Sequence, residues 1–277
     1  MQVFFLKGNL NPLNRIFINQ VKNNISHIEN YLKYKRLSYT RSEKVIKLTT
    51  TYNFENTTEF HCIDKVNINN KDISTLYIEI ANDIEFINKH HDLKKISSFF
   101  EIGGGFGSKV HFLLTNFKNI KKIIYLDIVP NIFVGTNYLK NFYGSKVIDY
   151  VATRNLKSIK FSDNDNLEIF SLPVWEIEKL DLKIDYFHNS HSFQEVPIHQ
   201  IKNYYKFLKN FMKNNTKISL ISYLSGILPK KIDDTNIMLS PEETLDPKII
   251  NQVFGSILSE HFFENSISTA SNVCYLN

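Results

Sequence analysis

Apolar residues recur every three or four positions in several stretches of the chain, which is the spacing of one face of a helix. These stretches predict helices over residues 12–35, 70–90, 109–117, 132–143, 198–212 and 247–258. Short apolar runs, several rich in β-branched residues, predict strands over residues 96–102, 122–128, 168–172, 184–189 and 217–224. Gly144 follows the fourth predicted helix, where a glycine suits a C-cap. The polar, Thr-rich stretch 39–59 has no clear period and is expected to be a loop or a flap over a site.

Strands and helices alternate in the second part of the chain, which indicates βαβ units and a parallel sheet. Two further apolar segments, 261–268 and 271–276, predict a hairpin at the edge of that sheet. The expected fold class is therefore α/β, with a Rossmann-like, mostly parallel sheet and an antiparallel C-terminal strand. We expect residues 1–92 to form a mainly helical cap and residues 93–277 to form the domain that contains the sheet.

The composition is that of an ordinary globular protein. Of its 277 residues 43% are hydrophobic and 22% are charged, and at roughly 100–200 residues per domain the length allows one large domain or two small ones. Only Cys62 and Cys274 occur, which excludes a disulfide framework and a multi-cysteine zinc site. No stretch approaches the ~20 apolar residues that span a bilayer, and no secretory signal is recognisable, so a cytoplasmic location is expected.

The distribution of charge and the spacing of the histidines indicate which classes of ligand the protein binds. The formal net charge of +5 comes almost entirely from lysines dispersed over predicted helices and loops, which is typical of a solvated surface rather than of nucleic-acid binding. The adjacent His90 and His91 lack further ligands at a metal-binding spacing, so no metal is expected. We expect a small-molecule partner, no nucleic acid and no membrane span, and a homodimer is left open.

A glycine-rich stretch, FFEIGGGFGS at residues 99–108, joins the first predicted strand of the sheet to the next helix. Glycine lets the backbone turn sharply and approach a ligand closely, and a helix N-terminus offers free N–H groups. Gly103, Gly105 and Gly107 are therefore candidates for lining a nucleotide-like ligand. Asp127 ends the second strand, where a carboxylate can accept hydrogen bonds from ribose hydroxyls. The alternative is a tight turn with no ligand.

The spacing of these residues distinguishes between nucleotide cofactors. A nicotinamide fingerprint requires G-x-G-x-x-G, whereas Gly103 and Gly105 are followed by Ser108 at the third position. The pattern E-x-G-x-G-x-G from Glu101 instead resembles motif I of the class I S-adenosylmethionine-dependent methyltransferases, which also carry an acid at the end of the second strand. The resemblance implies a seven-stranded sheet and S-adenosylmethionine as cofactor. It also implies cofactor contacts from Glu101, Gly103, Gly104, Gly105, Asp127, Ile128, Leu172, Pro173 and Asn189.

Polar side chains gather directly after the fourth predicted strand of the sheet. Open α/β sheets bind ligands at the carboxyl ends of their strands, and the residues placed there are His188, Asn189, His191, Gln194 and Glu195. We favour His191 as a general base because histidine has a suitable pKa without tuning, and His188 and Glu195 are the next candidates. Alternatively, His188 is a core histidine, Glu195 stabilises the start of the next helix, and Asn189 forms a turn.

Two blocks of sequence point to one group of methyltransferases. NSHSFQEV at 189–196 resembles the I-N-T-x-S-F/M-x-E-M signature of the sugar O-methyltransferases of bacterial polysaccharide clusters, and SLPVWEIE at 171–178 resembles the P-W-E run that precedes it. The resemblance covers about residues 95–225 and departs from the pattern at His188 and Val196. It implies O-methylation of a sugar or sugar-nucleotide hydroxyl in the biosynthesis of a surface polysaccharide such as a capsule, with Ser190 and Gln194 at the substrate.

The segment ahead of the expected catalytic domain carries a further candidate for acceptor binding. Arg36, Tyr39 and Arg41 are expected to bind the acceptor or, alternatively, to form a solvated loop. Trp175 is the only tryptophan, and we expect it in the core rather than beside an adenine. The other functions left open are methyl transfer to a phosphoryl- or amine-bearing acceptor, a nucleic-acid methyltransferase, a non-catalytic cofactor-binding subunit and a nicotinamide oxidoreductase.

Overall fold

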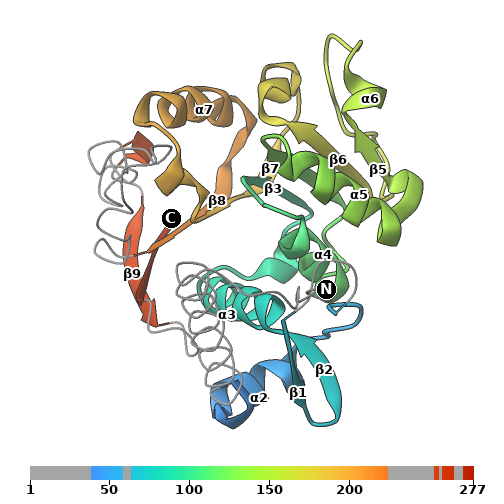
Figure 1. The fold of residues 1–277 in the computed structure, drawn as a ribbon. Coiled ribbons are helices and arrows are strands. Elements are labelled where there is room, and N and C mark those ends of the chain that lie inside the picture. The colour runs from blue at the N-terminus through green and yellow to red at the C-terminus, as the bar shows by residue number, and fades with distance from the viewer. Residues whose placement is uncertain (1–38, 59–63, 224–252, 256–257, 265–270) are drawn as a thin grey trace, which may run out of the picture.

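A computed structural model describes residues 39–58, 64–223, 253–255, 258–264 and 271–277, and its centre is an eight-stranded sheet (Figure 1). The strands of this sheet are β3 (Ser98–Ile102), β4 (Lys122–Asp127), β5 (Val147–Asp149), β6 (Glu168–Pro173), β7 (Ile184–Ser190), β8 (Met212–Tyr223), β9 (Ser259–Glu264) and β10 (Ser271–Leu276). Their order is β5-β6-β4-β3-β7-β8-β10-β9. Strands β3 to β8 pair in parallel, whereas β10 is antiparallel to both β8 and β9.

This sheet confirms the predicted fold class. The two segments near the end of the chain form the predicted hairpin, and the later of them, β10, lies between β8 and β9. The sheet has one strand more than the seven expected, because the short β5 pairs with β6 beyond the predicted edge. Three residues are too few to carry a period of their own, so the sequence did not reveal β5.

Helices cover both faces of the sheet, and alternation along each strand decides which residues meet them. Helices α3 (Thr75–His90), α4 (Ser108–Asn116) and α5 (Asn131–Tyr143) pack on one face and α7 (Ile198–Phe211) on the other (Figure 1). Successive side chains of a strand point to opposite faces. Phe99 and Tyr186 therefore belong to the core under α3 and α4, and their neighbours Phe100 and Phe187 belong to the core under α7.

The stretch 39–59 was expected to be a loop, and that expectation is wrong, because it contains the helix α2 (Glu43–Thr51). Ser42 caps this helix, its Oγ accepting a hydrogen bond from the backbone N–H of Val45. Val45 and Leu48 bury one face of the helix against neighbouring elements. Burial thus stabilises a helix whose three consecutive threonines have low intrinsic helix propensity.

The helix expected over residues 70–90 begins later, at Thr75. The residues before it form a hairpin of β1 (Lys65–Ile68) and β2 (Lys71–Ser74), beside α2 in Figure 1. Asn69 and Asn70 connect the two strands with φ values of 51° and 63°, and asparagine tolerates such angles in a two-residue hairpin turn.

The remaining predicted elements near the site are confirmed to within a few residues. Gly144 ends α5 as expected, with a φ of 56°. The predicted helix 12–35 lies outside the described residues, as does most of the predicted helix 247–258. Among the described residues, no helix combines the length and the hydrophobicity that crossing a bilayer would require.

Candidate functional site

The glycine-rich turn connects β3 to α4 at the carboxyl end of the central strand. Gly103, Gly105 and Gly107 have φ values of 75°, 61° and 78°, which residues with a Cβ rarely adopt. A Cβ added at Gly103 would lie 2.1 Å from Oγ of Ser192. The turn after β7 therefore presses against the glycine-rich turn, and only glycine permits this contact.

Gly104 is closely surrounded by side chains, whereas Gly105 has open space in front of it. A Cβ at Gly104 would lie 2.6 Å from Oε2 of Glu101 and 2.8 Å from a ring carbon of Tyr125, so a side chain has no room there. A Cβ at Gly105 would meet nothing within 4 Å. Tyr125 donates a hydrogen bond to the carbonyl of Gly105 and so fixes the turn from below. The outer side of the turn therefore opens onto a space that a ligand can enter.

Asp127, at the end of β4, shapes the same turn. Its Oδ2 accepts a hydrogen bond of 2.7 Å from the N–H of Gly105, and its Oδ1 accepts one of 2.7 Å from the N–H of Ile128. Burial raises the pKa of Asp127, and these backbone N–H groups oppose the rise. A carboxylate oxygen can accept more than one hydrogen bond, so capacity for ribose hydroxyls remains.

The residues expected beside an adenine divide into an exposed and a buried set. Ile128 is 56% exposed next to Asp127, whereas Pro173, which pairs with Asp127 across β4 and β6, is buried. Leu172 is completely buried in the core and cannot touch a ligand. The structure therefore brings Asp127, Ile128 and Pro173 together and leaves Leu172 in a packing role.

Glu101 is the most unusual group at the site. It is 1% exposed at the end of β3, and its Oε2 has no hydrogen-bond partner among the described residues. Burial raises the pKa of Glu101 to about 7, although the nearby Lys109 opposes the rise. A buried acceptor without a partner is costly, so this carboxyl group is suited to a cationic or donor group of a ligand.

A chain of buried polar groups runs behind Glu101. Lys109, in the first turn of α4, places its Nζ 2.8 Å from Nε2 of His188 and 3.6 Å from Oδ2 of Asp83 on α3. Nδ1 of His188 lies 2.7 Å from Oγ of Ser219 on β8. Burial raises the pKa of Asp83 to about 6, and Lys109 again opposes the rise.

A pocket of about 280 Å³ lies between α3, the glycine-rich turn and the end of β7. Its lining includes Glu79, Asp83, Glu101, Lys109, Ser190 and His191. Tyr39 is buried and donates a hydrogen bond of 2.8 Å to Oε1 of Glu79, so it supports the wall of the pocket. Three carboxyl groups and one ammonium group thus surround a space beside the carboxyl ends of two central strands.

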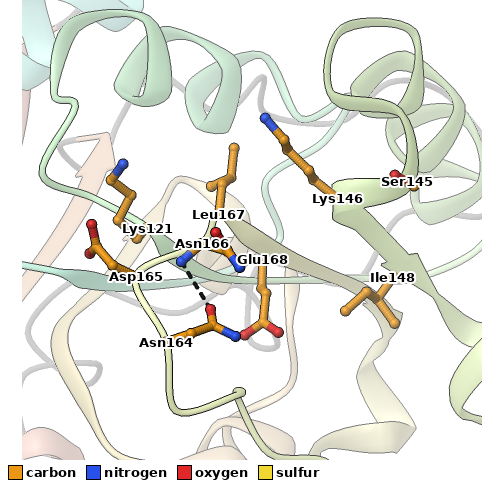
Figure 2. Close-up of a pocket in the computed structure, with 9 residues that line it drawn as sticks. All are labelled: Lys121, Ser145, Lys146, Ile148, Asn164, Asp165, Asn166, Leu167 and Glu168. Carbon is orange, nitrogen blue, oxygen red and sulfur yellow. Dashed lines mark hydrogen bonds between the residues drawn. The ribbon is translucent and has the colours of Figure 1, made fainter.

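A larger hollow of about 490 Å³ lies elsewhere, and Figure 2 shows the residues that line it. Lys121 and Glu168 belong to the amino ends of β4 and β6, and Asn164 accepts a hydrogen bond from the N–H of Asn166 there. Ligands of open α/β sheets bind at the carboxyl ends of the strands. We therefore place the candidate site at the smaller pocket by the glycine-rich turn.

The turn after β7 holds the histidine favoured as a base. His191 has a φ of 64°, a strained conformation for a residue with a Cβ. Burial, and secondarily Lys109, lower the pKa of His191 to about 3, so the ring is neutral at neutral pH. Ser190 lines the same pocket, whereas Gln194 is buried in the following turn. Strain and burial at a pocket wall are features typical of functional residues.

Asn189 has a structural role. Its Nδ2 donates to the carbonyl of Ile102 at 2.8 Å and to Oγ of Ser192 at 2.6 Å, and its Oδ1 accepts from the N–H of Phe193 at 3.2 Å. These bonds join the end of β3 to the turn after β7. The predicted cofactor contact of Asn189 stays untested, and the geometry favours its alternative role in the turn.

Other predicted residues do not line the pocket or lie outside the described ranges. Glu195 is exposed in the turn after β7, where its charge contributes to the raised pKa of Asp127, and Arg41 is exposed ahead of α2. Arg36 lies outside the described residues. The expectation that Trp175 is buried is wrong, since its side chain is 54% exposed. It follows the end of β6, and its ring stands edge-on to that of Tyr150, with the centroids 6.2 Å apart.

Sequence reasoning missed Asp83, Lys109 and Ser219. Lys109 left a trace, because it is a charged residue at the start of a helix that directly follows the glycine-rich turn. Asp83 lies on α3 and Ser219 on β8, far from the motif in sequence. Only the packing of α3 against α4 and the pairing of β7 with β8 bring them together.

Comparisons with known proteins concern the fold. The chain matches no family profile and no curated protein in sequence. Similar solved structures include a methyltransferase of Aquifex aeolicus dependent on S-adenosylmethionine (14% identity, TM-score 0.43, 70% of this chain and 89% of that one). A second, from Clostridium acetobutylicum, has 13% identity and a TM-score of 0.43 over 69% of this chain and 88% of that one.

A longer enzyme, the mitomycin 7-O-methyltransferase, is also similar in backbone. It shares 11% identity and a TM-score of 0.43 over 73% of this chain, which spans little more than half of that protein (56%). These likenesses are confined to the arrangement of the backbone. A similar backbone does not determine the function, which depends on the residues of this chain.

Proposed function

We propose that this protein is an S-adenosylmethionine-dependent methyltransferase. The single observation that carries the proposal is Glu101, a buried carboxyl group whose Oε2 has no partner among the described residues. It stands beneath a glycine-rich turn that opens onto a pocket, and a second acid, Asp127, follows at the end of the adjacent strand. The antiparallel β10 between β8 and β9 distinguishes this sheet from that of a nicotinamide dehydrogenase.

The residues present fit the proposed cofactor. Glu101 would bind its ammonium group, Asp127 its ribose hydroxyls, and the exposed side chain of Ile128 would lie against its adenine. The glycine-rich turn would let the backbone approach it closely, since Gly105 has open space in front of it. When bound, S-adenosylmethionine supplies a methyl group on a sulfonium, which is reactive toward a lone pair in line with it.

For the acceptor we propose a hydroxyl of a sugar or sugar nucleotide used in a surface polysaccharide. The support is the sequence block at 189–196, which forms the turn after β7 at the pocket wall. His191 would take the hydroxyl proton, and Ser190 would orient the acceptor. The region before residue 93 would select the acceptor, and Tyr39 would contribute through its bond to Glu79. The alternative is methyl transfer to another small acceptor that bears a phosphoryl or an amine group.

Isothermal calorimetry with S-adenosylhomocysteine tests the cofactor. We expect binding by the wild-type protein and a loss of about 10- to 100-fold in affinity for Glu101→Gln, because a charge-assisted hydrogen bond contributes roughly 1.5–3 kcal/mol. The exposed Glu178→Gln serves as a matched control and should bind like the wild type. No binding by the wild-type protein would overturn the proposal, and equal affinity for Glu101→Gln would overturn the role of Glu101.

A further inference from the structure

Lys109 is a buried lysine that no part of the proposed reaction yet uses. Only 6% of the residue is exposed, although a lysine is almost never buried without partners. Its ammonium group can only donate hydrogen bonds, so Nε2 of His188, 2.8 Å away, must accept. The carboxylate of Asp83 is the second partner, at 3.6 Å from Nζ. Two buried side chains from α3 and β7 therefore hold one cation in place.

The bond from Lys109 also determines the state of His188. With Nε2 accepting, the neutral ring carries its proton on Nδ1 and donates it to Oγ of Ser219, 2.7 Å away. Burial, followed by the charge of Lys109, keeps the pKa of His188 well below its usual range. His188 is fully buried, with both nitrogens engaged, and so it supports Lys109 rather than contacting an acceptor.

The other charged and titratable groups around Lys109 come from every element packed against it. They are Glu79 and Asp83 on α3, Glu101 on β3, His188 on β7, His191 in the turn after β7 and Cys274 on β10, and Asp127 on β4 acts on Glu101 as well. The charge of Lys109 favours the ionised form of Glu101 and disfavours the protonated form of His191. One fixed cation thus lowers the pKa of both groups that the proposed reaction needs, which favours a charged Glu101 and an uncharged His191.

We propose that Lys109 is a positioning residue whose ammonium group, held by His188 and Asp83 at the wall of the pocket that Glu101 and His191 also line, favours a charged Glu101 for the cofactor and an uncharged His191 for the acceptor. The inference rests on the proposed function. A carboxylate is required to bind an ammonium group, and only an unprotonated imidazole can accept a proton. Low dielectric at the pocket wall makes a buried charge act strongly on its neighbours.

Lys109→Met removes the charge and keeps most of the side-chain volume. The affinity for S-adenosylhomocysteine, measured by calorimetry against pH, should rise in the wild type as Glu101 ionises near its pKa of about 7. In Lys109→Met the midpoint should move upward by about 1–3 pH units, the effect of removing a nearby opposite charge. Lys146→Met is the matched control, because Lys146 is exposed at the distant hollow of Figure 2.

Lys109→Met leaves the carboxyl group of Asp83 buried without its partner, which can prevent folding. The double variant Lys109→Met/Asp83→Asn removes both charges, and its midpoint should still rise, because Lys109 acts on Glu101 more strongly than Asp83 does. Circular dichroism establishes that each variant is folded. An unchanged midpoint in the folded variants would overturn the inference.

A second readout needs no ligand. In the free protein with isotope-labelled histidine, NMR titration should show His191 neutral in the wild type down to strongly acidic pH, and its pKa should rise in Lys109→Met. His191→Ala assigns the resonance. If the wild-type protein binds no S-adenosylhomocysteine, the proposed function fails, and this titration alone decides whether Lys109 controls His191. An unchanged His191 titration would contradict the inference.

Discussion

At the scale of single residues, two groups at the pocket compete for the role of base. His191 is neutral at neutral pH, so one of its ring nitrogens is unprotonated, but burial and Lys109 lower its pKa to about 3 and make it a weak base. Asp83 has a pKa raised to about 6 by burial, which is closer to the pH at which a general base works best. Both line the same pocket, and they predict different pH dependences.

The dependence of kcat on pH distinguishes them, with S-adenosylmethionine and a panel of nucleotide sugars as acceptors. If His191 is the base, activity should persist below the pKa of Asp83, about 6, and His191→Ala should abolish turnover while the affinity for S-adenosylhomocysteine is retained. If activity of the wild type instead falls as pH decreases through about 6, and Asp83→Asn abolishes turnover while His191→Ala retains it, Asp83 is the base and the assignment to His191 is wrong.

The candidate site was predictable where its residues are close in sequence. Glu101 and the glycines form one motif, and Asp127 follows at a characteristic distance, so a single pass along the chain finds them. The buried partners Asp83 and Lys109 could not be found in that way. Their burial depends on how two helices pack, which no local pattern of the sequence records.

At the scale of elements, the side chain of Asp185 joins the amino ends of three strands. From the start of β7, its Oδ2 accepts hydrogen bonds from the N–H groups of Ser97 and Ser98, at 2.8 and 3.0 Å, ahead of and at the start of β3. Its Oδ1 pairs with Lys213 of β8 at 2.5 Å. Burial alone would raise the pKa of Asp185, yet the bonds from Lys213 and Ser97 hold it well below its usual range.

Asp185→Asn should therefore destabilise the fold in a pH-dependent way. A carboxyl group whose pKa is lower in the folded than in the unfolded state stabilises the fold above the unfolded value of about 3.9. We expect a loss of about 1–3 kcal/mol in the free energy of unfolding near neutral pH, measured by urea denaturation. The difference from the wild type should shrink as pH decreases below about 4. A constant difference over that range would show that the charge of Asp185 is not responsible.

The elements that sequence patterns predicted are the long or continuous ones. The strands β3, β4, β6 and β7 carry runs of apolar residues, because both faces of the sheet are covered by helices and both must be apolar. The hairpin β1–β2 has only four residues per strand. Asparagine is common throughout the chain, so Asn69 and Asn70 did not stand out as a turn. Short strands contain too few residues to show an alternation of apolar and polar positions. In a sequence rich in asparagine, an asparagine pair is also a weak indication of a turn.

At the scale of the whole molecule, the last described strand completes the core on which the site is built. Strand β10 pairs with β8 over Asn272–Leu276 and with β9 over Ser271–Leu276. Its Cys274 is fully buried in the same cluster as Tyr77 of α3 and Phe112 of α4. We therefore expect the C-terminal hairpin and the half that carries the glycine-rich turn to unfold as one cooperative unit.

The thiol of Cys274 makes this expectation measurable. Burial raises its pKa, so the native thiol should not react with a disulfide reagent until β10 detaches. In a Cys62→Ser background, S-adenosylhomocysteine at about 100 times its Kd should slow labelling about 100-fold, because a ligand that binds only the folded state stabilises it by roughly 2.7 kcal/mol. If β10 instead frays independently of the pocket, saturation with the ligand will leave the labelling rate unchanged, because the exposed thiol then reports only a local opening.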